Sequence, residues 1–316
     1  MFISDKIKFE QGVLLRNNSH YKIGGPARYF FEAKNVEEII EAVKIARQKK
    51  LNVFVLAGGT NILFSDDGFD GLILKPNIQF IKKDGNSLRV GAGVLIADLL
   101  NYLIINSLSG LEWTAGLPGT VGGAVRGNAG CFGGEIKDVI KEVTSLDIFS
   151  AAGKIIKRSK DDCGFNYRSS VFKINNKSEI IVEAVLALKE GDKELLQKVS
   201  EQNINYRKEN QPLEYPSIGS VFKNVNCDKI TESQRKKFKS IIKTDPFPVV
   251  PAAYLISEAG LKGVSYGGAM ISPKHPNFIV NVLNATSQDV KSLIFLAKNE
   301  VKTKFGITLE EEVEVL

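Results

Sequence analysis

Between residues 116 and 130 the chain has glycine at six of fifteen positions, and this run restricts its fold more than any other feature. Glycine permits positive φ angles and lets a ligand approach the main chain closely. Successive main-chain N–H groups in such a run can converge on an anion. A second glycine loop, 57–61, follows a strand expected at 51–56 and precedes an extended stretch at 62–64. Two such loops suit a diphosphate.

Neither loop fits the common nucleotide-binding motifs. A dinucleotide-binding Rossmann unit needs a strand, then G-x-G-x-x-G, then a helix. Residues 109–113 are too irregular for that first strand, and the chain after Asn61 turns extended. A Walker A loop is also absent, because no Gly-Lys-Ser/Thr follows a glycine run. The simpler interpretation, that both loops are only tight turns, leaves the number of glycines unexplained.

Length and composition predict an intracellular protein of more than one domain. A chain of 316 residues with 43% hydrophobic residues has enough for two or three domains. Its N-terminus has no signal-peptide core, and no segment approaches the ~20 apolar residues of a membrane span. We therefore expect a cytoplasmic protein without membrane insertion. Cys131, Cys163 and Cys227 are too few and too dispersed for a disulfide framework, which favours reduced thiols.

The net charge of +6 favours anionic ligands without selecting one class. The densest basic run, 235–239, is followed by Lys243, and apolar residues recur beside it at 238, 241 and 242. This spacing predicts a helix with a solvated basic face. No interleaved aromatic platform for stacked bases accompanies it, so we expect no nucleic-acid partner.

Hydrophobic periodicity indicates a mixed α+β chain. Asn35 is a plausible N-cap for the first helix. The expected helices cover 36–50, 96–105, 193–208, 252–259 and 287–305. The expected strands and extended segments cover 51–56, 88–94, 139–149, 154–158, 180–189, 219–223 and 308–315. Pro212 and Pro216 interrupt regular structure, and a new domain is expected to begin near them.

Sequence blocks along nearly the whole chain resemble one enzyme family. The two glycine loops look like those of the vanillyl-alcohol-oxidase type of FAD domain. Together with further blocks, they resemble the UDP-N-acetylenolpyruvoylglucosamine reductases, in the family's order. The further blocks are Asn18-Ser19, Ile23-Gly24-Gly25-Pro26-Ala27, Asn166-Tyr167-Arg168, Gln211-Pro212-Leu213-Glu214-Tyr215-Pro216, Gly219-Ser220-Val221-Phe222-Lys223-Asn224 and Gly267-Gly268-Ala269 through Asn281. The stretch after Ser220 is too short for an extra tyrosine-bearing loop, so the chain looks like the shorter, second type.

The resemblance implies an α+β flavoenzyme with three parts. These are FAD-binding subdomain 1 at 1–75, FAD-binding subdomain 2 at 76–205, and a substrate-binding domain with a terminal catalytic strand at 206–316. Such enzymes use NADPH to reduce a noncovalent FAD, which then reduces the enolpyruvyl ether of UDP-N-acetylglucosamine to UDP-N-acetylmuramate. This is a step in peptidoglycan precursor synthesis, connected with cell-wall biogenesis, cell shape and cell division. A monomer without a metal site is expected, and domain closure is expected to assemble the active site.

The resemblance also assigns the cofactor contacts to the two glycine loops. The protein supplies position and charge there, while the flavin supplies the hydride chemistry. The cofactor-binding candidates are Ala57, Gly58, Gly59, Thr60, Asn61, Pro118, Gly119, Thr120, Gly122, Gly123, Ala124, Asn128 and Gly130.

Three residues are implied in catalysis. Hydride addition to the terminal CH₂ carbon leaves negative charge at the adjacent carbon and its carboxylate, and the guanidinium of Arg168 can hold that carboxylate through two hydrogen bonds. Ser220 matches the family's proton donor and needs neighbours that stabilise its alkoxide. Ser220 to Lys223 also satisfies the S-x-x-K pattern of acylating serine enzymes, but the companion S-D-N and K-T-G elements are missing.

The third is Glu312, which aligns with the family's catalytic glutamate. Alternation in the expected terminal strand places Glu312 and Glu314 on one face. The alternative interpretation of this segment is a solvated acidic tail. Glu314 also departs from the family, where a basic residue commonly follows the final Glu-Val.

Substrate contacts are expected from residues that suit a UDP-sugar. The candidates are Tyr167, Arg207, Lys223, Asn224, Lys262 and His275. Asn210 stands where some family members have lysine. The chain has only two histidines, His20 and His275, which gives no support to a metal site or a catalytic triad.

Two other functions stay open on the sequence. A flavin oxidase of the same fold would react with oxygen and a small alcohol. A noncatalytic nucleotide-binding protein would bind a UDP-sugar without FAD.

Overall fold

The computed structural model describes residues 7–316 apart from 86, 149–152, 175–178 and 246. The chain forms two compact units, each built from segments that are separate in sequence. Unit 1 contains Met1–Val13, Ala27–Gly58 and Phe69–Tyr206. Unit 2 contains Leu14–Pro26, Gly59–Gly68 and Arg207–Leu316.

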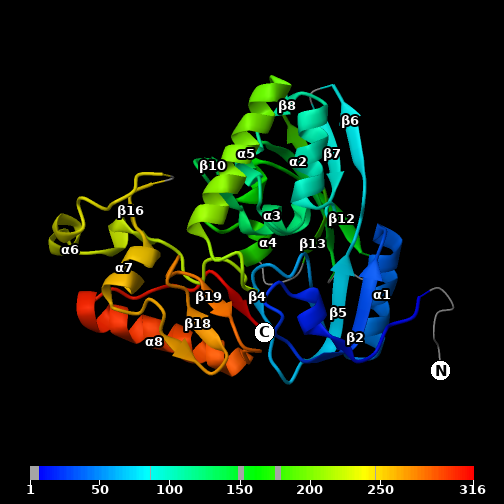
Figure 1. Ribbon diagram of the computed structural model, residues 1–316. Helices are drawn as coiled ribbons and strands as arrows, with labels where there is room; N and C mark the ends of the chain where they lie inside the picture. The colour runs from blue at the N-terminus through cyan, green and yellow to red at the C-terminus, as the bar shows by residue number, and fades with distance from the viewer. Residues whose placement is uncertain (1–6, 86, 149–152, 175–178, 246) are drawn as a thin grey trace. The chain divides into compact units, whose positions relative to one another are not determined.

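A parallel sheet covered by one helix begins unit 1. Strand β5 (Phe69–Pro76) pairs in parallel with β2 (Pro26–Ala33) on one side and β3 (Asn52–Val55) on the other. Helix α1 (Val36–Gln48) lies beside this sheet (Figure 1). Its side chains at 39, 42 and 46 are fully buried in a cluster that includes β5. The side chain of its N-cap, Asn35, accepts a hydrogen bond from the Glu38 amide.

The second sheet of unit 1 is antiparallel and has the strand order β12–β11–β13–β7–β6. The central strands are β11 (Ile140–Asp147) and β13 (Glu179–Ala187), with β7 (Ser87–Gly91) beyond β13. Residues of α2 (Ile96–Ile105) and α3 (Val121–Gly127) share a hydrophobic core with this sheet. The hydrophobic core under this sheet thus supports the glycine-rich run at 116–130, which contains α3.

Unit 2 has its own core. Helix α8 (Ser287–Phe305) packs against the antiparallel strands β17 (Ser265–Tyr266), β18 (Ala269–Ile271) and β19 (Ile279–Asn281). Helix α7 (Ala252–Glu258) also contacts α8. The short strands β4 (Ile62–Leu63) and β20 (Glu314–Val315) pair in parallel, so the segment at 59–68 joins the C-terminus of the chain.

The remaining elements are short or peripheral, apart from one long helix. In chain order they are β1 (Val13–Leu14), β6 (Ile81–Asp84), β8 (Leu108–Ser109), β9 (Gly130–Cys131), β10 (Gly134–Glu135), β12 (Lys154–Ser159), α4 (Val171–Ile174), β14 (Lys189–Glu190), α5 (Lys193–Asn210), β15 (Val225–Asn226), α6 (Glu232–Lys237) and β16 (Val249–Val250), together with short 3-10 turns.

Most predicted elements are confirmed. The helices expected at 96–105 and 287–305 have the predicted bounds, and the other helices differ by a few residues at their ends. The strand predicted at 139–149 is β11, and position 149 lies outside the described residues.

Two predictions of extended structure are wrong. The terminal strand predicted at 308–315 is reduced to the two residues of β20, so Glu312 and Glu314 do not share the face of a regular strand. Residues 219–223 form no strand and meet the C-terminal segment through a single antiparallel bridge, Phe222 to Glu311. Individual hydrogen bonds, rather than the regular pairing of a β-sheet, hold residues 219–223 and the residues before β20.

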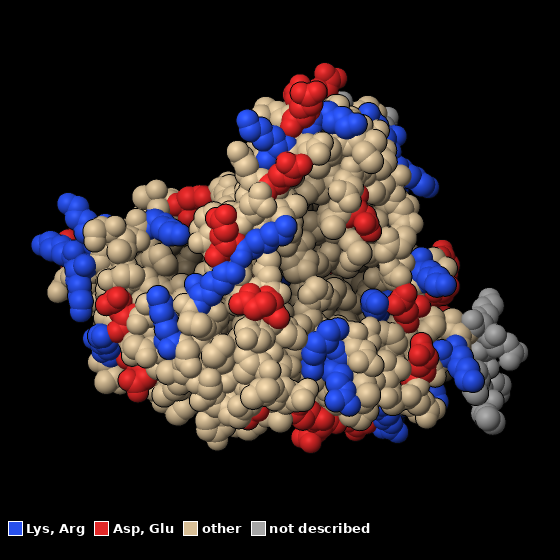
Figure 2. All heavy atoms as spheres, in the orientation of Figure 1, with Lys and Arg blue, Asp and Glu red and all other residues tan. Residues whose placement is uncertain are grey.

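The basic run is helical only at its start. Helix α6 ends at Lys237, and Phe238 directly after it is buried. Figure 2 shows lysines and arginines projecting over α6, as a solvated basic face requires. Over the described part of the chain, no helix is both long and apolar enough to cross a bilayer.

Candidate active site

The glycine-rich run contains a short helix that the sequence did not predict. The Thr120 side chain caps α3 by accepting a hydrogen bond from the Gly123 amide at 3.3 Å. The amides of Val121 and Gly122 donate to the carbonyls of Val94 and Ala92, both at 2.9 Å. The expectation that amides throughout this run face an anion is therefore wrong for 121–123, because protein acceptors already use them.

Loop 57–61, unlike residues 121–123, has main-chain amides that no described protein acceptor uses. Among the residues that the structure describes, no acceptor pairs with the main-chain N–H groups of Gly58, Gly59, Thr60 or Asn61. A row of such amides in a glycine loop is suited to a phosphate.

The backbone of this loop approaches the first run closely. A Cβ at Gly58 would lie 2.8 Å from the Gly119 Cα, so both positions need glycine. Pro118 beside them is exposed, and the Ala57 Cβ lies 3.3 Å from the position of a Cβ on Gly123. Within unit 1, Gly58 thus lies close to Gly119 of the glycine-rich run, and Ala57 lies close to Gly123.

Asn128 supports the end of the run rather than presenting its amide outward. It caps α3 in the left-handed conformation (φ 43°) and is fully buried. Its Nδ2 donates to Glu135 Oε1 and to the Asn166 carbonyl, both at 3.0 Å, and its Oδ1 accepts from the Lys137 amide. The side chain of this predicted cofactor residue is therefore engaged in fixing the hairpin that carries Arg168.

Arg168 lies at the tip of a tight hairpin. Asn166 and Ser169 exchange both main-chain hydrogen bonds at 3.0 Å, which leaves Tyr167 and Arg168 as the two turn residues. Arg168 adopts a φ of 53°, an uncommon conformation for a residue with a side chain. Such strain is concentrated at functional positions.

The Arg168 guanidinium lies 5.2 Å from the centre of the Tyr167 ring. One of its terminal nitrogens would be 3.4 Å from a Cβ at Gly130. Unit 1 therefore brings Arg168 to the end of the glycine-rich run, next to one of the predicted cofactor residues.

Ser220 and Glu312 lie on adjacent backbone segments of unit 2. The Val221 carbonyl accepts hydrogen bonds from the amides of Glu312 at 2.8 Å and Val313 at 3.4 Å. Ser220 and Glu312 are both half-buried. The structure thus places together two of the three residues that were predicted to be catalytic.

The cofactor loop is bonded to the same C-terminal segment. Asn61 Nδ2 donates to the Glu312 carbonyl at 3.0 Å, and the Asn61 carbonyl accepts from the Glu314 amide at 3.0 Å. Because these bonds continue into the β4–β20 pair, the position of the Glu312 main chain depends on that of Asn61 and the β4 strand that follows it.

The predicted substrate residues divide by exposure. Lys262 is exposed, Tyr167 is half-buried, and Arg207 near the end of α5 is buried. Asn224 accepts a hydrogen bond from the Ala252 amide at the start of α7, so its side chain is partly occupied.

Lys223 contacts a carboxylate of the C-terminal segment. Its ammonium bonds Glu310, and this contact holds the pKa of Glu310 below its ordinary value. The Glu310 carboxylate is more than half exposed, so the pair contributes little to stability.

His275 lies in a turn before β19 with its ring against Phe278, the ring centres 4.7 Å apart. Burial, with a smaller contribution from Lys243, lowers the pKa of His275. Among the described residues, its Nδ1 is buried without a hydrogen-bond partner. The lowered pKa favours the neutral form of the imidazole.

Asn277, in the same turn, was not among the predicted site residues. Its side chain bonds the main chain of Phe222, two residues after Ser220. A lone asparagine in a loop gives no local pattern from which this contact could be predicted.

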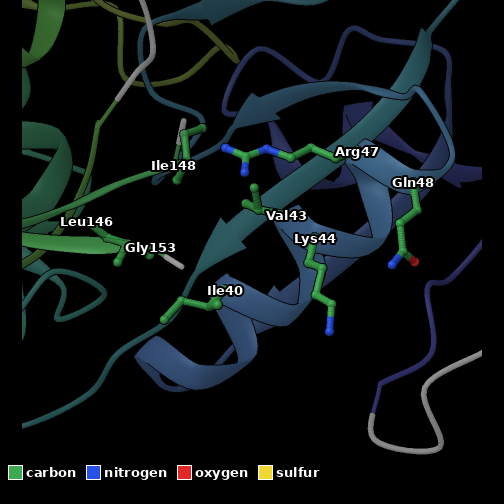
Figure 3. Close-up of a pocket in the computed structure, with 8 residues that line it drawn as sticks. All are labelled: Ile40, Val43, Lys44, Arg47, Gln48, Leu146, Ile148 and Gly153. Atoms are coloured by element: carbon green, nitrogen blue, oxygen red, sulfur yellow. The ribbon is translucent and has the colours of Figure 1, made fainter. Parts of the chain in front are cut away.

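A pocket of about 240 Å³ elsewhere in unit 1 contains none of the predicted site residues (Figure 3). It lies between α1 and the end of β11 and is mainly apolar, with polar groups from α1. Its lining residues are Ile40, Val43, Lys44, Arg47, Gln48, Leu146, Ile148 and Gly153. None of these eight lining residues carries a carboxylate, a hydroxyl or a thiol.

The cysteines show no sign of activation. Burial raises the pKa of the Cys163 thiol to about 11 and also raises that of Cys227. Such thiols stay protonated near neutral pH. Within the described ranges, no group of three or more His, Cys, Asp or Glu side chains is arranged to hold a metal ion.

Two family models match the chain. Residues 27–159 match the FAD binding domain, and residues 211–316 match the C-terminal domain of UDP-N-acetylenolpyruvoylglucosamine reductase. The first covers most of the two sheets of unit 1, and the second covers Ser220 and Glu312.

Individual relatives match over nearly the whole chain. The UDP-N-acetylenolpyruvoylglucosamine reductase of Caldicellulosiruptor saccharolyticus is 37% identical, with 98% of this chain and 92% of the relative covered. That of Clostridium novyi is 34% identical, with 99% and 94% covered. The crystal structure of the Thermus caldophilus enzyme of this name matches with a TM-score of 0.74 and 31% identity over 98% of both chains. The predicted α+β class with an FAD-binding domain is confirmed.

Proposed function

Because the chain belongs to the UDP-N-acetylenolpyruvoylglucosamine reductase family, a family of oxidoreductases, we propose that it reduces UDP-N-acetylglucosamine enolpyruvate to UDP-N-acetylmuramate. We further propose NADPH as the hydride donor and a role in peptidoglycan precursor synthesis. The observation that carries the proposal is the relationship over 98% of this chain and of the Thermus caldophilus enzyme. A match of that extent includes both the FAD-binding region and the region of Ser220 and Glu312.

The protein's first task is to hold the cofactor. The open amides of residues 58–61 would donate to the diphosphate, and the close approach of Gly58 to Gly119 would let both loops contact it. When bound there, FAD would supply the hydride chemistry that connects NADPH with the terminal methylene carbon of the enolpyruvyl group.

Arg168 would bind the enolpyruvyl carboxylate. Its guanidinium can make two parallel hydrogen bonds to that group and stays charged at any working pH. The hairpin and Asn128 fix its backbone, and the neighbouring Tyr167 ring limits where the guanidinium can lie. A fixed positive charge would stabilise the negative charge that develops at the carboxylate during hydride addition.

Ser220 would donate the proton that completes the reduction. The proton would pass from Oγ to the carbon that bears the carboxylate, while the methylene carbon receives the hydride. The Glu312 segment is bonded to the residue after Ser220, so we propose that its carboxylate orients substrate and supports the return of a proton to Ser220. The proposal requires Arg168, Ser220 and Glu312 to act on the same substrate molecule.

Product stoichiometry under anaerobic conditions tests this proposal. We expect one UDP-N-acetylmuramate for each NADPH oxidised and, in D₂O, deuterium at the carbon that bears the carboxylate. NADPH oxidation without a change in the sugar would overturn the assignment. Rapid peroxide formation from a small alcohol, with oxygen and without NADPH, would instead indicate an oxidase.

A further inference from the structure

The side chain of Asn277 makes the main-chain hydrogen bonds to Phe222 that a neighbouring β-strand would otherwise make. Asn277 is buried, with 4% of its surface exposed. Its Nδ2 donates to the Phe222 carbonyl at 2.8 Å, and its Oδ1 accepts from the Phe222 amide at 3.0 Å. Its own carbonyl accepts from the Val221 amide at 2.8 Å. Three hydrogen bonds from one residue therefore hold two successive residues that follow Ser220.

The opposite edge of this segment is held by the C-terminal chain. The Val221 carbonyl accepts from the Glu312 amide, and the Lys223 amide donates to the Glu310 carbonyl at 2.9 Å. The side chains of Val221 and Phe222 are almost fully buried, each 1% exposed. The segment after Ser220 is thus fixed between Asn277 on one edge and residues 310–313 on the other.

Among the described residues, no hydrogen bond holds the main chain of Gly219 or Ser220. Gly219 has a φ of 82°, and a Cβ placed there would meet no described atom within 4 Å. The direction of the Ser220 hydroxyl must therefore be set mainly by the residues that follow it. The Asn277 amide satisfies both the N–H and the C=O of Phe222 without extending past Ser220, whereas a full strand would continue past it.

The turn that carries Asn277 is itself closed by hydrogen bonds. The Ser272 amide donates to the Phe278 carbonyl, and the Phe278 amide donates to the His275 carbonyl, both at 2.9 Å. Ser272 Oγ accepts from the amides of Lys274 and His275. Asn277 is therefore mounted on a rigid turn, which allows it to transmit a fixed position to the Ser220 segment.

We propose that Asn277 is a positioning residue for proton transfer, holding the Ser220 segment in register with Glu312. This inference rests on the proposed role of Ser220 and adds a residue that does not contact the reacting atoms. Proton donation depends on sub-ångström placement, so loosening this segment lowers the rate of protonation more than it lowers substrate affinity.

Asn277→Ala tests the proposal, with Asn281→Ala as the matched control. Asn281 is also a buried asparagine of unit 2, 8% exposed, and its side chain likewise bonds two main-chain groups. Its Nδ2 donates to the Tyr21 carbonyl at 3.0 Å, and its Oδ1 accepts from the Ala285 amide at 2.8 Å. Both variants lose two buried hydrogen bonds, but only Asn277→Ala releases the Ser220 segment.

The measurements are the two half-reactions, substrate affinity and amide hydrogen exchange. For Asn277→Ala we expect reoxidation of the NADPH-reduced enzyme by substrate to slow about ten- to hundred-fold, with flavin reduction and substrate Kd changed less than about threefold. Amide exchange should accelerate in the peptide that covers 219–223. Asn281→Ala should leave unchanged both the reoxidation rate and the amide exchange of the peptide 219–223. This should hold even if its melting temperature falls as much as that of Asn277→Ala.

The double variant Asn277→Ala/Ser220→Ala distinguishes a positioning effect on Ser220 from a general disturbance of the fold. Because Asn277 acts through Ser220, adding Asn277→Ala to Ser220→Ala should slow reoxidation by no more than about twofold. If Asn277→Ala does not fold, Asn277→Ser, which keeps one hydroxyl at the position, carries the same expectation with a smaller loss of about tenfold.

Three results would overturn the inference: wild-type reoxidation in the folded variant, an equal loss in Asn281→Ala, or full additivity with Ser220→Ala. Failure of the wild-type enzyme to be reoxidised by the sugar would instead contradict the proposed function. The exchange of residues 219–223 would still report whether Asn277 holds that segment.

Discussion

In the proposed function, Ser220 is a weak acid whose surroundings must support the transfer of its proton. The residue after it is bonded to the Glu312 amide, and the next is bonded to Asn277. Lys223, three residues after Ser220, is engaged with Glu310. We therefore propose that Glu312 and the local main chain, rather than Lys223, support the serine hydroxyl.

Ser220→Ala should separate the two half-reactions. The hydroxyl takes part only in protonation, so NADPH should still reduce the flavin at close to the wild-type rate. Reoxidation by the enolpyruvyl sugar should slow about 10²- to 10⁴-fold, as expected for loss of a general acid. Stopped-flow absorbance of the flavin measures both rates.

Ser217→Ala is the matched control, because Ser217 is a half-buried serine three positions earlier in the same segment. It should retain both rates. Equal slowing of both half-reactions in Ser220→Ala would count against Ser220 as the proton donor.

His275 makes stability depend on pH. Burial, with help from Lys243, lowers its pKa below the ordinary value of 6.5. As pH falls below 6.5, the unfolded chain takes up a proton that folded His275 resists, so the stability present above this pH is progressively lost. This contribution cannot exceed about 1.4 kcal/mol per pH unit.

His275→Asn should flatten the dependence of the urea unfolding midpoint on pH between 6.5 and 5. His20, whose pKa is also lowered by burial, is present in both proteins and contributes equally to their curves. Parallel curves for wild type and variant would show that His275 does not remain neutral in the folded state.

The roles of single residues came from the family resemblance more than from local pattern. Nothing in the sequence near Arg168 distinguishes it from a surface arginine, and its positive φ is visible only in the structure. The contact of Asn277 with Phe222 joins residues 55 positions apart in sequence, so no local period could reveal it.

At the scale of elements, the two glycine-rich segments differ in whether their main-chain amides are open to a ligand. Loop 57–61 keeps its amides open, whereas α3 uses the amides of 121–123 within the protein. The helix N-terminus of α8 is likewise occupied, because Asp66 accepts hydrogen bonds from the amide and hydroxyl of Ser287 at 2.7 Å. The proposed diphosphate contacts therefore come from the open amides of residues 58–61 rather than from the N-terminus of α3 or α8.

Gly58→Ala should weaken FAD binding while leaving the fold intact. The added Cβ would lie 2.8 Å from the Gly119 Cα, and neither backbone can move aside without displacing its loop. Overpacking of this kind costs about 1–3 kcal/mol, which corresponds to a rise of roughly 5- to 150-fold in the FAD Kd. Titration of apoprotein by flavin fluorescence measures it.

Gly127→Ala is the matched control from the same glycine-rich run. A Cβ at Gly127, within α3, would meet no described atom within 4 Å. It should bind FAD with wild-type affinity. Unchanged affinity in Gly58→Ala would contradict the close approach of the two loops.

Long periodic elements could be predicted from the sequence, whereas short ones could not. Helices α2 and α8 were predicted with the bounds that the structure has, because each has an apolar face of several turns. Helix α3 was missed, since a segment rich in glycine has low helix propensity and forms here through its Thr120 cap and its core contacts. Strand β20 is short because individual hydrogen bonds hold the residues before it.

At the scale of the whole molecule, each of the two compact units is built from segments that are not continuous in sequence. Residues 14–26 and 59–68 belong with the C-terminal region, not with their sequence neighbours. Tyr21 donates a hydrogen bond to the Ile279 carbonyl at 2.7 Å, and Asn281 donates to the Tyr21 carbonyl. The domain boundaries predicted at 75 and 205 were based on the family resemblance. Contacts between residues more than 250 positions apart could not be inferred from a local sequence pattern.

The central claim is that this chain transfers a hydride from NADPH to an enolpyruvyl UDP-sugar through FAD. An anaerobic visible spectrum of the purified protein tests it most directly, recorded before NADPH, after NADPH, and after addition of the sugar. We predict flavin absorbance at the start, bleaching by NADPH and recovery when the sugar is added. A colourless protein that cannot be reconstituted with FAD, or bleaching without recovery, would contradict the account.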